Sequence, residues 1–290
     1  MTKPVFLLGV GCQKGGTTWL HHYLSGHESV QLSSPKELNI FETMLRPDLF
    51  LRFYFRCLAE DRDWIKKLRR MRKNNPAFAT PRQQIEMMND PSIYVEYFKQ
   101  FSDKRVTGDI TPTYAVLQAD DFSYIRSLLD DHFHVKTIFL MRDPVERTRS
   151  ALRMKLRADH NQVARHLNMS EEDFFRRQFD KTMYVELSLY NNTIAALEAA
   201  FPKEDIFYGF FETMFNDGFL ADLCDFLTIP FKPGDFGRVV NETAKSGHFD
   251  PDLIAQARAL YDPAYAFCAE RFGEEFIAGI WPHYRMAPSG

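Results

Sequence analysis

Nine residues near the start of the chain have the composition of an anion-binding turn. The stretch GCQKGGTTW, residues 11–19, directly follows a short apolar run, PVFLLGV. Gly11 and Gly16 have the spacing of the two glycines in the nucleotide-binding loop G-x-x-x-x-G-K-[ST], but Thr17 stands where that loop has its lysine. A lysine is present three residues earlier, as Lys14. The spacing predicts a phosphate- or sulfate-binding loop with a displaced lysine.

The predicted loop would offer both backbone and side-chain donors. A strand, a glycine-rich turn and a helix in succession direct backbone N–H groups and a helix N-terminus at one point, which binds anionic oxygens without a metal ion. Gly15 and Gly16 let the backbone come close to a ligand, and Thr17 and Thr18 add hydroxyl donors at the start of the helix. The alternative interpretation is a tight strand-to-helix turn that binds nothing.

A second candidate anion-binding segment is RDPVERTRS, from Arg142 to Ser150. Arg142 ends an apolar run, and Ser150 follows about two helical turns later. Parallel α/β sheets bind ligands outside the carboxyl ends of their strands. Both side chains could therefore reach one anion, from the side opposite the glycine loop, with the guanidinium offering a planar fork of donors.

Short apolar runs that alternate with longer helical patterns must position these residues. Such an alternation predicts an α/β fold with a central parallel sheet flanked by helices on both faces. A helix should follow the loop and end at Gly26, and another should run from Pro144 to about Leu156. The expected strands are residues 4–10, 134–142 and 205–211, with a weaker one at 105–110.

Two segments lack strand signals and look like helical insertions over the ligand edge of the sheet, at about 45–100 and 158–182. The first contains a basic run, Lys66 to Lys73, which could be interpreted as a nucleic-acid patch. A single run without interleaved aromatic residues favours a solvated helix face instead. No repeat or linker is visible, so residues 1–290 are expected to form one domain.

Composition excludes several classes of function. The chain has 290 residues, is 45% hydrophobic and 26% charged, and carries a net charge of −3, as an ordinary globular protein does. This balance argues against coating nucleic acid or an anionic membrane, so an anion site requires a local concentration of positive groups. The first apolar run is far shorter than the roughly 20 residues that span a bilayer, and no signal peptide is visible, so a cytoplasmic location is expected.

The cysteines are few and widely spaced. Their positions are 12, 57, 224 and 268, with no C-x-x-C pair. Reduced, buried thiols are therefore expected in place of a disulfide scaffold or a zinc site.

Together, the two candidate segments resemble those of the sulfotransferase superfamily that uses 3′-phosphoadenosine 5′-phosphosulfate (PAPS). QKGGTTWL is similar to that family's 5′-phosphosulfate loop, and RDPVERTRS to its 3′-phosphate segment. The resemblance implies a three-layer, P-loop-like fold, PAPS as co-substrate and no required metal. It also implies that Lys14 contacts the oxygen bridging phosphate and sulfur, that Arg142 and Ser150 bind the 3′-phosphate, and that the loop contributes nucleotide contacts from Gln13, Lys14, Gly15, Gly16, Thr17, Thr18 and Trp19.

A third segment, SPKELNIF, is similar to one in heparan-type carbohydrate sulfotransferases and their bacterial relatives. In that branch a glutamate shortly before a phenylalanine is the catalytic base, which implies Glu37, with Phe41 as the aromatic residue. The acceptor would be a hydroxyl or amine of a carbohydrate or a small molecule. GDITPTYAV departs from the branch, because Ile110 stands where a lysine is usual.

The segment NETAKSGHFDPDLIAQARALY is similar to the family's C-terminal loop, in which basic residues cover the 3′-phosphate and adenine. The candidates there are Lys245 and His248.

Two other functions remain open at this point. A P-loop kinase or NTPase would need a lysine at position 17 and a Mg²⁺-binding aspartate at a strand end, for which Asp143 is the nearest candidate. A binding protein that has kept the nucleotide cradle and lost catalysis is the second alternative, and Ile110 is its best support. Asp109 or a histidine would be the next candidate base after Glu37.

Overall fold

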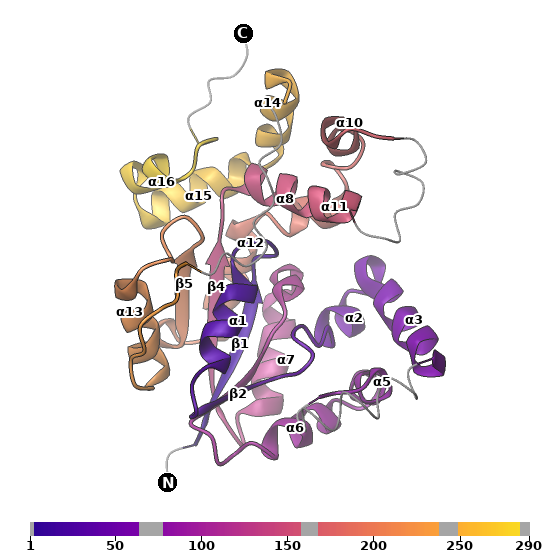
Figure 1. Cartoon of the computed structure of the whole chain (residues 1–290), viewed down its shortest axis with the longest axis vertical. Helices are drawn as coiled ribbons and strands as arrows, with labels where there is room; N and C mark the ends of the chain where they lie inside the picture. The colour runs from indigo at the N-terminus through magenta and orange to yellow at the C-terminus, as the bar shows by residue number, and fades with distance from the viewer. Residues whose placement is uncertain (1–2, 64–77, 158–167, 238–248, 285–290) are drawn as a thin grey trace.

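A five-stranded parallel sheet lies at the centre of the computed structural model, which describes residues 3–63, 78–157, 168–237 and 249–284 (Figure 1). The strand order is β2-β3-β1-β4-β5 and every pairing is parallel. The strands are β1 (Val5–Gly11), β2 (Val30–Leu32), β3 (Val106–Ile110), β4 (His134–Met141) and β5 (Ile206–Phe210). The predicted parallel sheet is confirmed. The sequence analysis missed β2, because three residues are too few to show a periodicity.

The position of β1 determines where a ligand can bind. This strand lies between β3 and β4, and the chain order reverses on its two sides. In open parallel sheets the crevice outside the carboxyl ends of the strands at such a point is the usual binding site. The glycine loop after β1, Thr111 after β3 and Arg142 after β4 therefore meet at one edge of the sheet.

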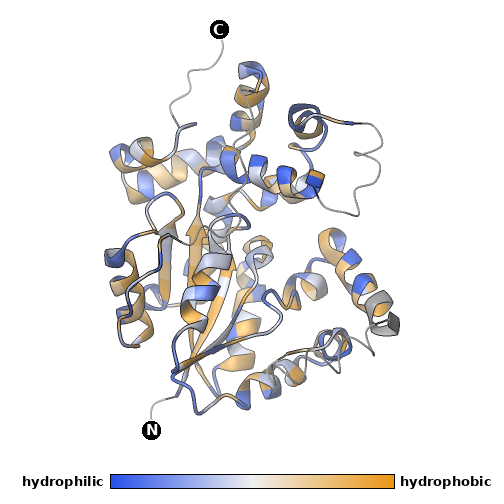
Figure 2. Ribbon diagram, in the orientation of Figure 1, coloured by the Kyte–Doolittle hydropathy of each residue, from blue (hydrophilic) through white to orange (hydrophobic). Residues whose placement is uncertain are grey.

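Helices cover both faces of the sheet. Strands that are buried on two sides carry apolar residues almost continuously, and these strands do so. All seven residues of β1 are buried. On one face α1 (Thr17–Ser25) and α13 (Asp217–Leu227) pack against the strands, and on the other α7 (Ala119–Leu129) and α12 (Tyr190–Ala200) do so. Figure 2 shows the hydrophobic residues concentrated on the strands and on the inward sides of these helices. The three layers predicted from the sequence are present.

The described parts of the two insertions are helical, as predicted. The first follows α2 (Phe41–Leu45) and comprises α3 (Pro47–Asp63), α5 (Pro81–Asn89) and α6 (Pro91–Lys99), and the second includes α10 (Glu171–Arg176). Proline opens α3, α5 and α6, and the side chains of Thr80 and Asp90 cap the last two. A single parallel bridge joins Ser34 to Phe78. The basic run 66–73 and residues 158–167 lie outside the described ranges.

The segment after β4 forms the long helix α8 (Pro144–Arg157), with proline at its first position as expected. Next come α11 (Thr182–Glu186), α12 and β5, and the chain ends in three helices, α14 (Pro251–Leu260), α15 (Asp262–Phe272) and α16 (Glu274–Ile280). Two short 3-10 turns, η1 (Pro112–Val116) and η2 (Lys203–Asp205), connect the remaining elements. Among the described helices, none combines the length and the apolar character that crossing a membrane would require.

Candidate active site

The glycine loop forms a narrow turn whose shape excludes larger residues at two positions. The amide of Gly15 donates a 2.9 Å hydrogen bond to the carbonyl of Cys12. A Cβ at Gly15 would lie 2.7 Å from the Cys12 sulfur, and one at Gly16 would lie 2.6 Å from the Met214 sulfur. Gly16 also has φ +89°, a conformation that glycine adopts without strain. The glycines therefore close the turn directly in front of α1.

The first turn of α1 presents its backbone N–H groups toward the loop. Gly16 is the N-cap residue and provides no side-chain cap, so the orphan amides of this helix end remain available to an anion. Thr17 is buried and Thr18 half-buried, and within the described ranges neither hydroxyl forms a side-chain hydrogen bond. Gln13 is half-buried beside them. This cradle fits an anionic group such as a phosphosulfate.

Trp19 is buried against aromatic side chains from α1 and from the chain on either side of α13. Its ring is nearly parallel to Tyr23 and to Phe236, with centroid distances of 5.9 and 5.8 Å, and meets Phe215 edge-on at 5.2 Å. A nucleotide base could stack on Trp19 only if one of these rings moved. The nucleotide contact of Trp19 stays a prediction.

Arg142 lies directly against the loop. Its Nη1 donates a 3.1 Å hydrogen bond to the Lys14 carbonyl, and its guanidinium stacks over the Phe211 ring at 4.3 Å. The two sequence motifs therefore meet, and Arg142 borders the loop where the sequence had suggested the opposite side. Ser150 is half-buried two turns along α8.

Asp143, the candidate Mg²⁺ ligand of the kinase alternative, has a structural role. Its wholly buried carboxylate accepts hydrogen bonds of 3.0 Å from the Tyr265 hydroxyl and from the backbone amides of Glu146 and His283. These bonds attach the C-terminal helices to the end of β4. Among the described residues, no group of three or more His, Cys, Asp or Glu side chains is arranged to hold a metal ion.

Lys14 lies at the centre of a group of charged side chains. Its pKa is lowered, first by burial and then by the positive charge of Arg142, while the negative charge of Glu37 acts in the opposite direction. Arg153 and Lys36 lower it further. Its Nζ lies 3.6 Å from the sulfur of Met154. The structure therefore brings both Arg142 and Glu37 within electrostatic reach of Lys14.

Glu37 lies in an irregular segment between β2 and α2. Its carboxylate forms an ion pair with Lys36 and its side chain is 40% exposed, so the carboxylate is accessible to a ligand. The backbone at Glu37 has φ +67°, and its carbonyl accepts a 2.7 Å hydrogen bond from the side-chain Nδ2 of Asn39. Strained residues of this kind cluster at functional sites.

Asp109 at the end of β3 organises the backbone around Glu37. This buried carboxylate accepts hydrogen bonds from the Tyr114 hydroxyl at 2.7 Å and the Thr111 hydroxyl at 2.9 Å. It also accepts longer bonds from the Leu38 amide at 3.5 Å and the Ser33 hydroxyl at 3.4 Å. These contacts identify Asp109 as a positioning residue, and its complete burial keeps it from any acceptor.

A second buried carboxyl group, Glu42, lies near Glu37 at the start of α2. The Thr113 hydroxyl donates a 2.6 Å hydrogen bond to one of its oxygens, whereas the other oxygen is buried without a partner. Burial, with smaller contributions from the charges of Asp109 and Glu37, raises the pKa of Glu42 to about 8. Glu42 is therefore largely protonated at neutral pH. No sequence motif indicated that Glu42 would be buried with a raised pKa.

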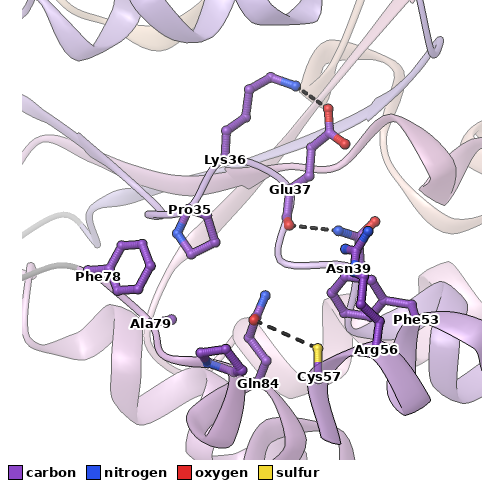
Figure 3. Close-up of a pocket in the computed structure, with 11 residues that line it drawn as sticks. Pro35, Lys36, Glu37, Asn39, Phe53, Arg56, Cys57, Phe78, Ala79 and Gln84 are labelled. Carbon is purple, nitrogen blue, oxygen red and sulfur yellow. Dashed lines mark hydrogen bonds and ion pairs between the residues drawn. The ribbon is translucent and has the colours of Figure 1, made fainter. Parts of the chain in front are cut away.

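A cavity of about 300 Å³ adjoins Glu37 on the side of the first insertion (Figure 3). Lys36 and Glu37 lie at one end of it, and Gln84 and Cys57 at the other. Phe53, Arg56 and Phe78 belong to its wall. The sequence analysis placed these insertion helices over the ligand edge, but it could not identify the wall residues, because no spacing pattern connects α3 with Phe78 and α5.

Other predicted residues lie elsewhere. Ile110 is fully buried beside Gly9, in the apolar core under α1, so its side chain does not face the cavity. Lys245 and His248 are outside the described ranges. The cysteines at positions 12, 57, 224 and 268 are buried, as predicted.

Comparison with known proteins identifies the family of the chain. The model of the family described as the sulfotransferase family matches residues 4–233. A solved sulfotransferase from Alicyclobacillus acidocaldarius is 21% identical, covers 99% of this chain and 100% of its own, and has a TM-score of 0.60. The sulfotransferase domain of the Synechococcus PCC 7002 olefin synthase is 18% identical and has a TM-score of 0.47. The match covers 95% of this chain and 96% of that domain. No curated protein matches the sequence. The chain belongs to the sulfotransferase family.

Proposed function

We propose that the protein transfers a sulfuryl group from PAPS to a hydroxyl or amine acceptor, with Glu37 as the base. The observation that carries this proposal is that Arg142 contacts the loop at the Lys14 carbonyl, while Glu37, which lines a cavity, lies within electrostatic reach of Lys14. A nucleotide-binding loop alone would explain the first two side chains. The accessible carboxylate next to a cavity supplies the remaining requirement for transfer.

Lys14 and the loop would stabilise charge on the donor. The lysine directly precedes the two glycines that close the turn, so its backbone is held in place before the ligand arrives. Preorganised donors directed at developing negative charge are the largest contributors to many enzymatic rates. The amides at the start of α1 and the hydroxyls of Thr17 and Thr18 would contribute further donors.

Arg142 and Ser150 would distinguish PAPS from nucleotides without a 3′-phosphate. Arg142 is held on both sides, by the Lys14 carbonyl and by the Phe211 ring. The fixed guanidinium can form a charge-assisted hydrogen bond to phosphate at little entropic cost. Contacts from Trp19, Lys245 and His248 to the nucleotide remain part of the proposal.

Glu37 would accept the proton of the acceptor as the new bond to sulfur forms. Its carboxylate forms an ion pair with Lys36 and is of the residue type that serves as a general base. The Asp109 hydrogen bonds and the buried Phe41 fix the backbone on either side of it. The heparan-type or bacterial carbohydrate branch rests on this glutamate, and a metal-independent reaction is part of the same proposal.

Nucleotide binding followed by turnover tests the proposed function. We expect adenosine 3′,5′-bisphosphate to bind in the presence of a chelator, and ATP with Mg²⁺ to bind much more weakly. Sulfuryl transfer from PAPS to a mixed panel of hydroxyl and amine acceptors is then measured. Preferential binding of ATP with Mg²⁺ would favour the kinase alternative, and nucleotide binding without turnover of any acceptor would favour a binding protein.

A further inference from the structure

The backbone on which Glu37 lies has an unusual conformation. Glu37 has φ +67° and Asn39 has φ +55°, so two of the three residues in the segment 37–39 adopt the left-handed region. Asparagine is enriched in that region, whereas other residues that carry a side chain are uncommon there. Such conformations persist only where the surrounding structure determines them. The contacts that hold residues 37–39, the base segment, therefore determine where Glu37 lies.

Leu38, in the middle of the base segment, is held by contacts from two other parts of the chain. Its side chain is fully buried in the larger hydrophobic core. Its amide donates a 3.5 Å hydrogen bond to the Asp109 carboxylate of β3, and its carbonyl accepts a 3.1 Å hydrogen bond from Nε2 of Gln84 in α5. The Gln84 bond has the usual length for an N–H···O contact, and the Asp109 bond is longer. Gln84 therefore provides the firmer hold on the Leu38 backbone.

Gln84 is well placed to hold a carbonyl in one position. Its side chain is 5% exposed and points from α5 toward the turn that carries Glu37 and Asn39 (Figure 3). The Cys57 thiol of α3 lies 3.9 Å from the other end of the same amide, at Oε1. The amide thus lies between two helices of the first insertion and the base segment, and burial restricts it to this arrangement.

Gln84 also connects the base segment with the cavity. Glu37, Asn39, Cys57 and Gln84 are all among the residues that line it. One side chain of the first insertion therefore contacts both the backbone next to the proposed base and the space that adjoins it. A displacement of this side chain would move the base segment, and a misplacement of about 1 Å can cost an enzyme ~10²-fold in rate.

We propose that Gln84 is a positioning residue that holds Glu37 in place for proton transfer, through its hydrogen bond to the Leu38 carbonyl. This proposal rests on the proposed sulfuryl transfer and adds to it a residue of the first insertion. Gln84 acts through the backbone and exchanges no proton. The acceptor proton passes to the Glu37 carboxylate, the acceptor atom bonds to sulfur, and the bond from sulfur to the bridging oxygen of PAPS breaks with its electron pair on the phosphate.

Two variants of Gln84 remove the hydrogen-bond donor. Q84M replaces the amide by an apolar side chain of similar length, and Q84E keeps the shape of glutamine but cannot donate when it is ionised. Single-turnover transfer from PAPS is measured with a mixed acceptor panel that includes 4-nitrophenol and glucosamine. We expect both variants to transfer more slowly by about 10- to 100-fold. A titration with adenosine 3′,5′-bisphosphate should show unchanged affinity, because Gln84 contacts the base segment and not the glycine loop.

The matched control is Q83M, on the same helix. The Gln83 side chain accepts a 3.0 Å hydrogen bond from the Thr80 amide and belongs to the cap at the start of α5. Gln83 is not among the residues that line the cavity. Q83M therefore weakens the insertion without removing the bond to Leu38. It should lower the melting temperature and leave the transfer rate unchanged.

A double substitution distinguishes positioning from a general structural effect. If Gln84 acts through Glu37, its loss has no further consequence once the basicity of Glu37 is absent, because residues that act as a unit are not additive. Q84M should therefore slow transfer in the wild-type protein and not in the E37Q variant. A merely structural disturbance of the site would slow both by the same factor.

The outcomes separate this proposal from the proposed function. Wild-type transfer rates in Q84M and Q84E, a loss shared with Q83M, or equal losses with and without E37Q would overturn the positioning role and leave sulfuryl transfer intact. If neither Gln84 variant folds while Q83M does, Gln84 is a structural residue and the proposal is equally wrong. Failure of the wild-type protein to bind adenosine 3′,5′-bisphosphate, or to transfer to any acceptor, would instead remove the proposed function and this proposal with it.

Discussion

Replacing Glu42 by glutamine should change how the stability of the protein depends on pH. Burial raises the pKa of Glu42 to about 8, from an ordinary value of 4.5. As the pH rises above 4.5, the unfolded chain loses this proton while the folded protein keeps it. The folded state then binds more protons, so the free energy of unfolding falls with rising pH until the folded carboxyl ionises near pH 8.

The size of the effect follows from the shift in pKa. Each unit is worth about 1.4 kcal/mol, so Glu42 should lower the stability of the wild-type protein by roughly 3–5 kcal/mol between pH 5 and pH 9. Glutamine keeps an oxygen that can accept the Thr113 hydrogen bond and cannot ionise. Burying the glutamine amide changes the free energy of unfolding by the same amount at every pH, because the amide does not titrate. Urea denaturation at pH 5, 7 and 9 measures the slope.

The control is E96Q, because Glu96 is 66% exposed and pairs with Lys99 on the surface of α6. E96Q should follow the wild-type slope, and E42Q should be flatter. Equal slopes for E42Q and the wild type would show that Glu42 is ionised in the folded protein and that the reasoning from its burial is wrong.

Three further substitutions address the donor site. Lys14→Ala should lower kcat by about 10²–10³-fold with a smaller effect on nucleotide affinity, because the lysine contact strengthens as the bond to sulfur breaks. Single-turnover rates and a binding titration measure the two effects separately, and a loss confined to affinity would contradict this role. Arg142→Ala should weaken the binding of adenosine 3′,5′-bisphosphate by ~1.5–3 kcal/mol and barely change the binding of adenosine 5′-phosphosulfate. Calorimetry measures both affinities, and equal losses for the two nucleotides would refute the 3′-phosphate contact. Gly16→Ala should destabilise the protein by about 1–3 kcal/mol in thermal unfolding, because its φ is +89° and the new Cβ would meet Met214; an unchanged melting temperature would count against the strain argument.

The sheet and the glycine loop could be predicted because their signals are local. The apolar runs are continuous where strands are buried on both faces, and the glycine spacing lies within one turn. Pro144 is also a local signal, because proline is favoured at the first position of a helix, and α8 begins at this residue. The bounds of the predicted strands agree with the structure to within one residue at either end.

The rest of the site depends on contacts between distant segments. Asp109 looks like one polar residue in a weak strand, and only the fold shows that it accepts hydrogen bonds from Ser33 and Leu38, more than 70 residues earlier. The raised pKa of Glu42 arises from burial, which no motif encodes. Burial likewise places Ile110 in the core, where the sequence had suggested only a missing acceptor contact.

The most direct measurement of the central claim is single-turnover sulfuryl transfer by the Glu37→Gln variant, paired with a nucleotide titration. The substitution is nearly isosteric and removes only the basicity of the side chain. A base within hydrogen-bond reach contributes about 10²–10⁴-fold to such a step. We predict that Glu37→Gln binds adenosine 3′,5′-bisphosphate normally and transfers the sulfuryl group more slowly by a factor in that range, with Lys36→Ala milder. Full activity of Glu37→Gln with a responsive acceptor would contradict the account and place the base elsewhere.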